Sequence, residues 1–272
     1  MGFITFDALC RPVTRIPPNG DTCFVEELTL AVSRASGSAV IVVAGHGPSG
    51  RATSGPAQRG GATDGFHIED GQIEDLLNTR ILHVGGVGLM NRMDDSGRTE
   101  EIMREAKQRG VITTLDVFAS TAADLPKVER LLPFTDYFLP SEEEARALSG
   151  LTDNRDLAQF LLDRGAGCVI LTLGAEGTYY RHGDGTEFHT PAFDVVVKCT
   201  CGCGDCFNGG FATGLLKGLS AQEAVQIAQA SSAQNATGLG SQAGVRDYQA
   251  TLDFIRQTAV KPGKDALASA RV

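Results

Sequence analysis

The sequence predicts one α/β domain built around a mostly parallel β-sheet with helices on its faces. From Ile81 onward, short apolar runs alternate with segments of helical periodicity, which is the pattern of βαβ units. The helical segments begin at capping residues and acidic first turns, and several end at glycines. The length of 272 residues, with 42% hydrophobic residues, suits a single domain that is large enough to bury a core.

The predicted elements follow one another closely along the chain. Strands are predicted at residues 81–89, 111–117, 135–140 and 168–174. Helices are predicted at residues 99–110, 141–150, 155–166, 207–219, 220–240 and 247–259. For the first helix we expect Thr99 as the cap and Gly110 as the stop. Ser220 has Glu223 three residues later, which is the pattern of a capping box.

The first third of the chain departs from this alternation. Residues 3–9 and 22–32 indicate two strands joined by a Pro/Gly turn at residues 17–21. Residues 38–45 fit either a strand or the remnant of a helix. Residues 47–65 are rich in Gly, Ser, Thr and Pro without periodicity, and this segment exceeds the usual limit of about 12–15 residues for a connection. We expect a disordered insert there, or a place where structure has been lost.

Composition and charge exclude several classes of function. The formal net charge is −9, and an acidic chain gains no counterion-release energy on nucleic acid, so we expect no nucleic-acid partner. No segment approaches the roughly 18 consecutive apolar residues of a membrane span, and no signal-peptide pattern is present, so we expect no membrane partner. Seven unevenly placed cysteines are unlike a secreted disulfide framework, which favours a cytoplasmic location.

Four cysteines, Cys199, Cys201, Cys203 and Cys206, fall within the segment CTCGCGDCFNGG at residues 199–210. One interpretation is a thiolate metal or redox site, although the spacing differs from the C-x₂₋₄-C pairs of structural zinc sites. A second is that the cysteines are small packing residues. A helix N-terminus at this place would lower the pKa of Cys203 or Cys206 and make the loop oxidisable.

A third interpretation of the same segment is a phosphate-binding loop. Residues 195–200 are predicted as a strand, Gly202 and Gly204 permit a tight turn, and a helix is predicted to begin near Asp205. The unpaired amides and the macrodipole at the start of a helix attract an anion. Asp205 is then either the helix cap or a base beside a transferring phosphoryl group.

The segment CTCGCGDCFNGGFATGLLKGL resembles the C-terminal signature of the PfkB, or ribokinase-like, family of carbohydrate kinases, which is D-T-T-G-A-G-D-x-F followed by a glycine-rich helix. ILTLGAEGTYY at residues 170–180 resembles the family's nucleotide-binding T-x-G-x-x-G segment, and YFLPSEEEARALSG at residues 137–150 resembles its N-x-x-E segment. The resemblance implies a ribokinase-like α/β fold with a small N-terminal β lid. It also implies ATP-dependent phosphorylation of a hydroxyl group on a sugar or sugar-like substrate.

The resemblance assigns roles to residues around the glycine loop. It implies that Asp205 contacts the substrate hydroxyl and accepts its proton. The amides around Gly202, Cys203 and Gly204 would form the anion hole for the γ-phosphate. The nucleotide-binding residues implied by the family are Thr172, Gly174, Gly177, Asn235 and Gly238.

Two acidic residues outside the loop receive roles from the same resemblance. Glu144 would help to hold Mg²⁺ through water, and Asp7 would bind the sugar. Taken without the resemblance, Glu144 is a solvated helix residue and Asp7 is a turn residue at the end of a strand.

The chain departs from the family pattern at several positions. Cys199 and Cys201 replace an aspartate and a threonine where the family binds a monovalent cation, and K⁺ prefers oxygen ligands to thiols, which weakens the case for activation by K⁺. Ser141 replaces the asparagine of N-x-x-E, which shortens the reach to magnesium. The N-terminal G-G-x-x-x-N signature is not evident, and part of the lid is missing, which predicts weak or wasteful activity because lid strands exclude water.

These observations together predict residues 1–272 as one ribokinase-like domain. Its parts are a partial sugar-binding and lid region (1–47), a Gly-rich linker (48–66), a nucleotide-binding core (67–260) and a tail (261–272). A carbohydrate kinase using ATP and Mg²⁺ is the favoured function. A degenerate member that binds nucleotide or sugar without turnover, and a Cys-rich metal or redox protein, are the alternatives. Dimerisation through the lid is common in the family, and the incomplete lid leaves homodimerisation open.

Overall fold

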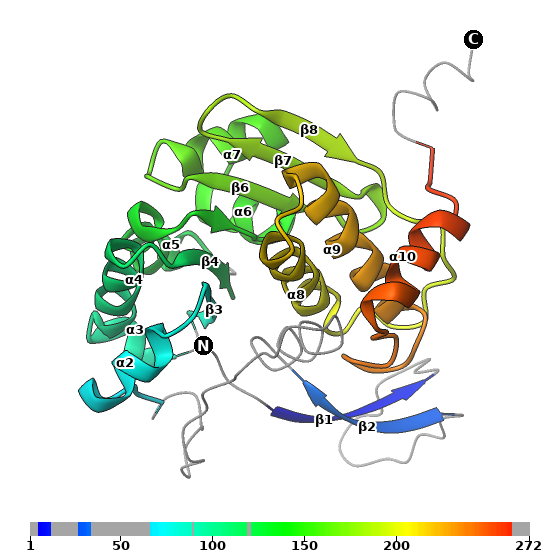
Figure 1. The fold of residues 1–272 in the computed structure, drawn as a ribbon, viewed down its shortest axis with the longest axis horizontal. Helices are drawn as coiled ribbons and strands as arrows, with labels where there is room; N and C mark the ends of the chain where they lie inside the picture. The colour runs from blue at the N-terminus through cyan, green and yellow to red at the C-terminus, as the bar shows by residue number, and fades with distance from the viewer. Residues whose placement is uncertain (1–4, 12–26, 34–65, 89, 119–120, 263–272) are drawn as a thin grey trace.

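A six-stranded sheet forms the centre of the computed structural model, which describes residues 5–11, 27–33, 66–88, 90–118 and 121–262 (Figure 1). The strands lie in the order β3-β4-β5-β6-β7-β8. Four are parallel: β3 (Ile81–Val87), β4 (Ile112–Val117), β5 (Tyr137–Phe138) and β6 (Cys168–Thr172). The last two, β7 (Thr178–His182) and β8 (Glu187–Thr190), pair in antiparallel fashion. The predicted mostly parallel sheet is therefore confirmed.

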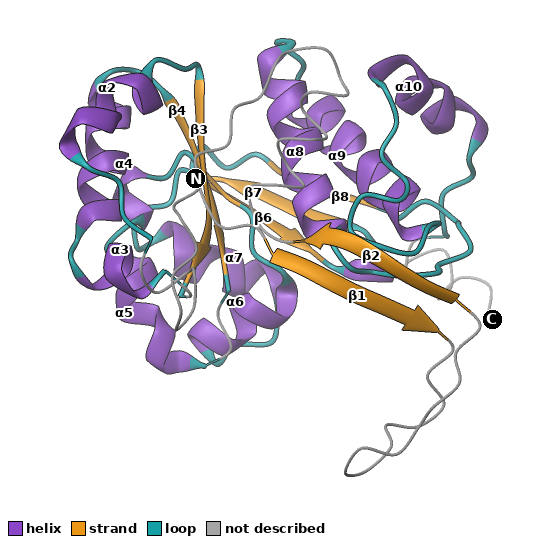
Figure 2. Cartoon of the chain, turned by 90° about the horizontal axis from the view of Figure 1, so that it is seen from below, coloured by secondary structure: helices purple, strands orange, loops and turns teal. Residues whose placement is uncertain are grey.

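Helices cover both faces of this sheet (Figures 1 and 2). One group follows the first strands: α2 (Asp70–Leu77), α3 (Asn91–Asp95), α4 (Arg98–Gln108), α5 (Leu125–Glu129), α6 (Glu142–Ser149) and α7 (Asn154–Leu162). The second group ends the described chain: α8 (Cys203–Leu216), α9 (Ala221–Ala236) and α10 (Tyr248–Gln257). None of the helices in the described ranges is long and apolar enough to cross a membrane.

The strand β6 shows how the two faces are filled. Val169 and Leu171 belong to a core cluster with residues of α4 and α7, whereas Cys168 and Ile170 belong to a second cluster with residues of α8 and α9. Successive side chains of a strand point to opposite faces, so a strand that is buried on both sides is apolar throughout. This explains why the segment CVIL has no polar alternation.

Helix boundaries follow local capping chemistry. The side chains of Ser220 and Glu223 form the predicted capping box at the start of α9. The prediction that Thr99 caps α4 is wrong, because the N-cap is Gly97 in the left-handed conformation and Thr99 is buried one residue inside the helix. Gly110, with a φ of 73°, follows the end of α4 as predicted.

Residues 195–200 differ from their prediction as a strand. They form no strand, and the amides of Lys198 and Cys199 donate instead to the carbonyl of Ala236 at the end of α9, at 2.7 and 3.3 Å. Val196 is 83% exposed, so the apolar run that suggested a buried strand lies largely at the surface. Apolar composition alone does not distinguish these two environments.

The N-terminal strands pair with each other. β1 (Thr5–Arg11) and β2 (Glu27–Ser33) form an antiparallel pair in which Asp7 lies opposite Ala31. The predicted turn at residues 17–21, the segment at 38–45 and the Gly-rich segment at 47–65 lie outside the described residues.

Candidate active site

The candidate site lies where the parallel strands end. Asp116 is near the end of β4, Ser141 follows β5, and Thr172 ends β6. Ser141 and Thr172 form an isolated parallel bridge, and the Thr172 amide donates to the Pro140 carbonyl at 3.1 Å. Ligands of open α/β sheets bind outside the carboxyl ends of the strands, so the topology itself selects this edge.

Three carboxyl groups from different elements interact electrostatically at this edge. Burial raises the pKa of Asp116 well above its usual range, and the negative charges of Glu144 and Asp205 raise it further. The hydrogen bond from the Val117 amide to Asp116 Oδ1, at 2.9 Å, opposes this rise without cancelling it. Asp116 is not among the residues predicted from the sequence, although a carboxylate near the end of a predicted buried strand is the signal by which it can be found.

Glu144 is held in place by the cap of α6. The Glu144 Oε2 atom accepts hydrogen bonds from the Ser141 amide and from the Ser141 hydroxyl, both at 2.8 Å, and the Glu144 amide donates to Ser141 Oγ at 3.2 Å. This capping box fixes the carboxylate at the sheet edge. Glu144 is therefore a half-buried, positioned group rather than a solvated helix residue.

The start of α8 has the geometry of a glycine turn leading into a helix. Gly202 is the N-cap, with a φ of 70°, and a Cβ atom there would lie 2.5 Å from Ser241 Cβ. Asp205 is the third residue of α8, and no side chain caps this helix. The alternative in which Asp205 serves as the helix cap is therefore not what the chain adopts, and its carboxylate lies in the first turn.

The three amides predicted for the anion hole differ in their environments. The Cys203 amide donates to the Thr200 carbonyl at 3.2 Å. The amides of Gly202 and Gly204 have no hydrogen-bond acceptor in the part of the chain that the structure describes. A Cβ on Gly204 would meet nothing within 4 Å, so open space lies in front of this residue.

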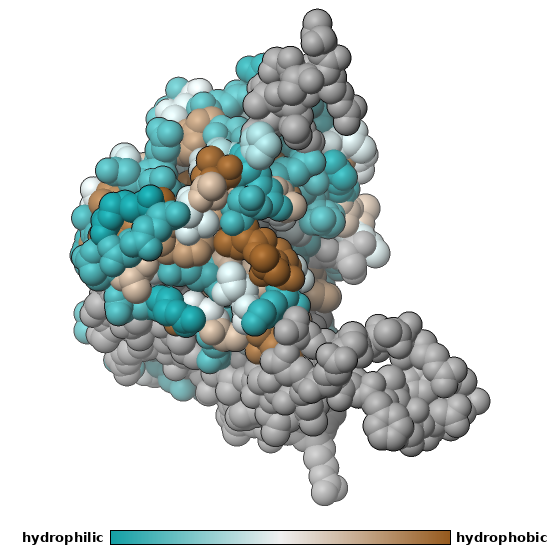
Figure 3. Space-filling model, turned by 90° about the vertical axis from the view of Figure 1, so that its right-hand side faces the viewer, coloured by the Kyte–Doolittle hydropathy of each residue, from teal (hydrophilic) through white to brown (hydrophobic). Residues whose placement is uncertain are grey.

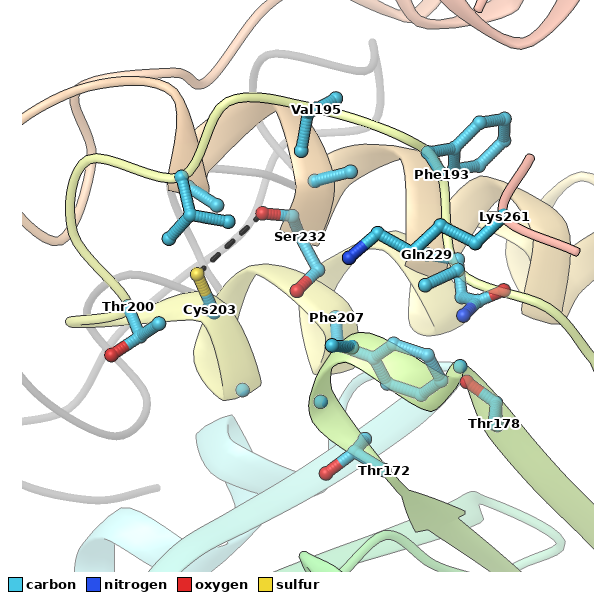
Figure 4. Close-up of a pocket in the computed structure, with 18 residues that line it drawn as sticks. Thr172, Thr178, Phe193, Val195, Thr200, Cys203, Phe207, Gln229, Ser232 and Lys261 are labelled. Atoms are coloured by element: carbon cyan, nitrogen blue, oxygen red, sulfur yellow. Dashed lines mark hydrogen bonds between the residues drawn. The ribbon is translucent and has the colours of Figure 1, made fainter. Parts of the chain in front are cut away.

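A pocket of about 360 Å³ lies beside this helix start (Figure 4). Thr172, Gly174 and Gly177 of the turn between β6 and β7 line it, and Cys203 and Gly204 of α8 line it too. The other lining residues are Ala175, Thr178, Ala192, Phe193, Val195, Val197, Thr200, Phe207, Gln229, Ser232, Ala233, Ala236 and Lys261. The structure thus brings together five of the residues predicted for nucleotide and phosphate binding.

The turn between β6 and β7 requires a glycine at its end. Gly177 has a φ of 107°, and a Cβ atom there would lie 2.0 Å from the Thr190 carbonyl oxygen. The Leu173 amide donates to the Gly177 carbonyl at 2.8 Å, which closes the turn. The absence of a side chain at Gly177 therefore lets this turn pack directly against the end of β8.

Asn235 and Gly238 lie outside the lining of this pocket. The buried Asn235 side chain donates from Nδ2 to the Cys201 carbonyl at 2.8 Å and accepts from the Gly244 amide at 3.4 Å. A Cβ on Gly238 would lie 2.3 Å from Ala243 Cβ. The Asn235 side chain thus holds the glycine loop at Cys201, and the nucleotide-binding role of both residues stays a prediction.

The cysteines of the loop contact different partners. The thiol of Cys203 points to the Ser232 carbonyl at 3.6 Å, and the thiol of Cys206 to the Ser241 carbonyl at 3.6 Å, whereas Cys201 is exposed. No group of three or more His, Cys, Asp or Glu side chains in the described ranges is placed to hold a metal ion. These contacts favour packing over a thiolate cage.

The expected lowering of the cysteine pKa is corrected by the structure. Burial raises the pKa of Cys203 and raises that of Cys206 well above its usual range. The negative charge of Asp205 contributes to the rise for both thiols. Burial and the neighbouring carboxylate both disfavour the thiolate form, which is the form that a redox-sensitive cysteine requires.

The rim of the pocket is hydrophobic on its outer side. Val197 lines the pocket and is 53% exposed, and Val260 is exposed to a similar extent. On the side of the molecule where α10 lies, small hydrophobic patches interrupt a mostly hydrophilic surface (Figure 3). Lys261, which the sequence analysis assigns to the tail, lies at this rim and lines the pocket.

Comparison with known proteins agrees with the fold and identifies the family. The family model described as pfkB family carbohydrate kinase matches residues 28–247, and the chain belongs to this family. A ribokinase of Haemophilus influenzae is 35% identical over 132 residues, which is 47% of this chain and 43% of that protein. An ATP-dependent 6-phosphofructokinase of Thermoanaerobacterium thermosaccharolyticum is 29% identical over 65% of this chain and 56% of that protein. The chain spans about half the length of the curated relatives it matches.

Solved structures confirm the ribokinase-like fold. A putative ribokinase from Agrobacterium tumefaciens superposes with a TM-score of 0.78 at 20% identity, covering 94% of this chain and 96% of that one. A putative ribokinase II from E. coli, solved in complex with ATP and Mg²⁺, superposes with a TM-score of 0.60 at 25% identity. That match covers 68% of this chain and 61% of the E. coli chain.

Proposed function

We propose that this chain transfers the γ-phosphoryl group of ATP to a hydroxyl group of a sugar or sugar-like substrate, with Asp205 as the base. One observation carries the proposal. The Asp205 carboxylate lies in the first turn of α8, next to the open Gly204 amide and within electrostatic reach of Asp116. The names of the relatives, which are sugar kinases, support the same reaction class.

The groups around α8 supply what phosphoryl transfer requires. The substrate hydroxyl oxygen forms a bond to the γ-phosphorus while the bond from that phosphorus to the β,γ-bridging oxygen breaks, and ADP departs with the electron pair. The hydroxyl proton passes to the Asp205 carboxylate. The amides of Gly202 and Gly204 donate to the oxygens on which charge collects, and this preorganised stabilisation is a large part of catalysis of this kind.

Mg²⁺ fits the acidic edge of the sheet. The pKa of Asp116 is raised by burial and by two neighbouring carboxylates, and a bound cation relieves this crowding of negative charge. Since these carboxylates do not form a direct metal cage, Asp116 and Glu144 would hold the ion through water, as Mg²⁺ commonly requires. When bound, Mg²⁺ neutralises charge on the phosphates. The case for K⁺ stays weak, because Cys199 and Cys201 replace residues that carry oxygen ligands in the family pattern.

The nucleotide fits the pocket between the β6–β7 turn and α9. Its volume of about 360 Å³ falls in the range of roughly 300–1,000 Å³ that is typical of ligand sites. Thr172, Gly174 and Gly177 would contact ATP from one side, and Phe193 and Phe207 contribute apolar surface. Asp7 of β1 would bind the sugar substrate, and this role stays a prediction.

Further features of the whole protein follow from the proposal. We expect it to work in the cytoplasm, where ATP is supplied, with a small sugar-like molecule and ATP as its partners. Homodimerisation is an additional expectation that size-exclusion chromatography with light scattering checks.

The proposal is tested by replacing the base. Asp205→Asn keeps the size of the side chain and removes its basicity, so ADP formation with a panel of pentoses, hexoses, keto-deoxy acids and nucleosides should fall about 10²–10⁴-fold. ATP affinity should change by only a few-fold. Asp163→Asn, at the exposed end of α7, is the matched control and should retain full activity.

Two outcomes would contradict the proposal. Equal turnover by wild type and Asp205→Asn would remove Asp205 from the reaction. ATP binding by the wild type without transfer to any substrate of the panel would favour a nucleotide-binding, non-catalytic member of the family.

A further inference from the structure

Lys261 belongs to a segment that is fixed against the wall of the nucleotide pocket. The Lys261 amide donates to the Ala192 carbonyl at 2.8 Å, and the Asp194 amide donates to the Ala259 carbonyl at 2.8 Å. Phe193 and Val260 form an isolated antiparallel bridge between these two hydrogen bonds. The chain that follows α10 therefore adds a short strand-like edge to the pocket.

The side chain of Lys261 points into the pocket. Figure 4 shows it extending from beside Phe193 across the pocket towards Ser232, which is the direction of the start of α8. The carbonyl group of Ser232 accepts a hydrogen bond from the Cys203 thiol, so this part of α9 lies against the glycine loop at the start of α8. The direction of the ammonium group is thus towards the end of the pocket where an anion is expected.

Among the described residues, the charge of Lys261 has no acidic counterpart in the pocket. Of the lining residues that the structure describes, Lys261 alone is charged, and none is Asp or Glu. Its ammonium group forms no ion pair within the described ranges of the chain. A cation that points into a largely apolar pocket is costly unless an anion pairs with it.

A second side chain in the same pocket has an oxygen atom without a donor. Gln229 of α9 is 7% exposed, and its Oε1 atom has no hydrogen-bond partner among the residues that the structure describes. A buried amide oxygen without a donor is rare in folded proteins, and here it lines a space that a ligand can fill. An adenine amino group is a donor of the required kind. This observation points to a bound nucleotide independently of the charge on Lys261.

We infer that the Lys261 ammonium group binds the phosphate chain of the nucleotide, on the side opposite the Gly204 amide, so that the segment after α10 completes the nucleotide site. The inference rests on the proposed function only in taking the ligand to be a nucleoside phosphate. It adds a cation that the glycine loop itself does not provide, since no Lys or Arg lies between Thr200 and Leu216.

The test compares phosphorylated and unphosphorylated ligands on the full chain. Lys261→Met keeps the length and apolar stem of the side chain and removes its charge, whereas Lys261→Arg keeps the charge. Lys198→Met removes the same charge from an exposed position that does not line the pocket, and it is the matched control. Dissociation constants for ATP, ADP and adenosine are measured by calorimetry for each variant.

For Lys261→Met we expect ATP and ADP to bind about 10- to 100-fold more weakly, which is the range for one hydrogen bond to a charged group. Adenosine should bind as it does to the wild type, which also shows that the pocket is intact. Lys261→Arg should bind ATP within about threefold of wild type, and Lys198→Met should be unchanged.

Unchanged ATP affinity in Lys261→Met, or an equal loss for adenosine and ATP, would overturn the inference. These outcomes are separate from failure of the proposed function, because binding is measured without turnover. A wild type that binds ATP through Lys261 but phosphorylates nothing would sustain the inference and reject the kinase activity. A wild type that binds no nucleotide would reject both.

Discussion

Asp116 is the carboxyl group of the site whose ionisation is opposed both by burial and by two neighbouring negative charges. It lies next to the last residue of β4, it is half-buried, and two other carboxylates act on it. The folded protein therefore binds a proton at Asp116 more tightly than the unfolded chain does. The stabilising contribution of this protonation is complete below the ordinary pKa of an aspartate, near 4, and is lost as the pH rises through the raised pKa of the folded state.

This linkage predicts that Asp116→Asn stabilises the apoprotein at neutral pH. The variant should gain free energy of unfolding on the order of 1 kcal/mol at pH 7.5 without Mg²⁺, because a crowded negative charge is removed. The gain should shrink towards zero near pH 4. Urea unfolding across this pH range measures both values, and Asp163→Asn serves as a control at an exposed position. A destabilised variant at pH 7.5, or a gain independent of pH, would contradict this account.

Single residues show where sequence reasoning succeeds and where it stops. The position of Gly204 and Asp205 at the start of a helix was predictable from the glycine turn before it, whereas their roles in the reaction come from the family resemblance and stay predictions. Asp116 and Lys261 were missed because their significance depends on contacts that form only in the folded chain. The pKa of Cys203 was predicted in the wrong direction, since the helix start was visible in the sequence but the burial of the thiol was not.

At the scale of elements, the opening of α8 combines two glycines with different physical roles. Gly202 adopts a left-handed conformation and packs against Ser241, so it shapes the turn. Gly204 has helical geometry and faces open space, so its lack of a side chain leaves room for a ligand.

Alanine substitutions should separate these two roles. Gly202→Ala should lose more than about 2 kcal/mol of folding free energy, because a left-handed alanine costs roughly 1–2 kcal/mol and its Cβ also meets Ser241. Gly204→Ala should keep or slightly raise stability, since alanine favours a helix by about 0.5–1 kcal/mol. It should nevertheless weaken ATP binding. Urea unfolding and calorimetry measure the two effects, and loss of stability in Gly204→Ala with intact ATP binding would reverse the assignment.

The main elements were predictable because each carries its own signal. The capping box of α9, the left-handed glycine after α4 and the β-branched run of β6 all act locally. Residues 195–200 were predicted as a strand and are not one, because their hydrogen bonds go to the end of α9. That choice of partner is a tertiary effect, which an apolar run cannot reveal.

At the scale of the whole molecule, the site is a consequence of topology. Parallel strands place their carboxyl ends at one edge, so the ends of β4 and β6 and the helix that follows β5 bring Asp116, Thr172 and Glu144 to the same edge. The helices α8 and α9 cover the face of the sheet opposite to α4 and α7, and they bring the glycine loop to this edge (Figure 2). The predicted division of the chain into lid, linker, core and tail remains a prediction, apart from Lys261, which lies at the pocket.

The central claim is that the backbone at the start of α8 receives the terminal phosphoryl group. The most direct measurement is the ¹⁵N–¹H shift of the Gly204 amide, with ADP and with a non-hydrolysable ATP analogue, each in the presence of Mg²⁺. We predict a large downfield shift with the analogue and a much smaller one with ADP, because only the analogue carries a γ-phosphate. An amide that responds to neither ligand, or equally to both, would contradict the account.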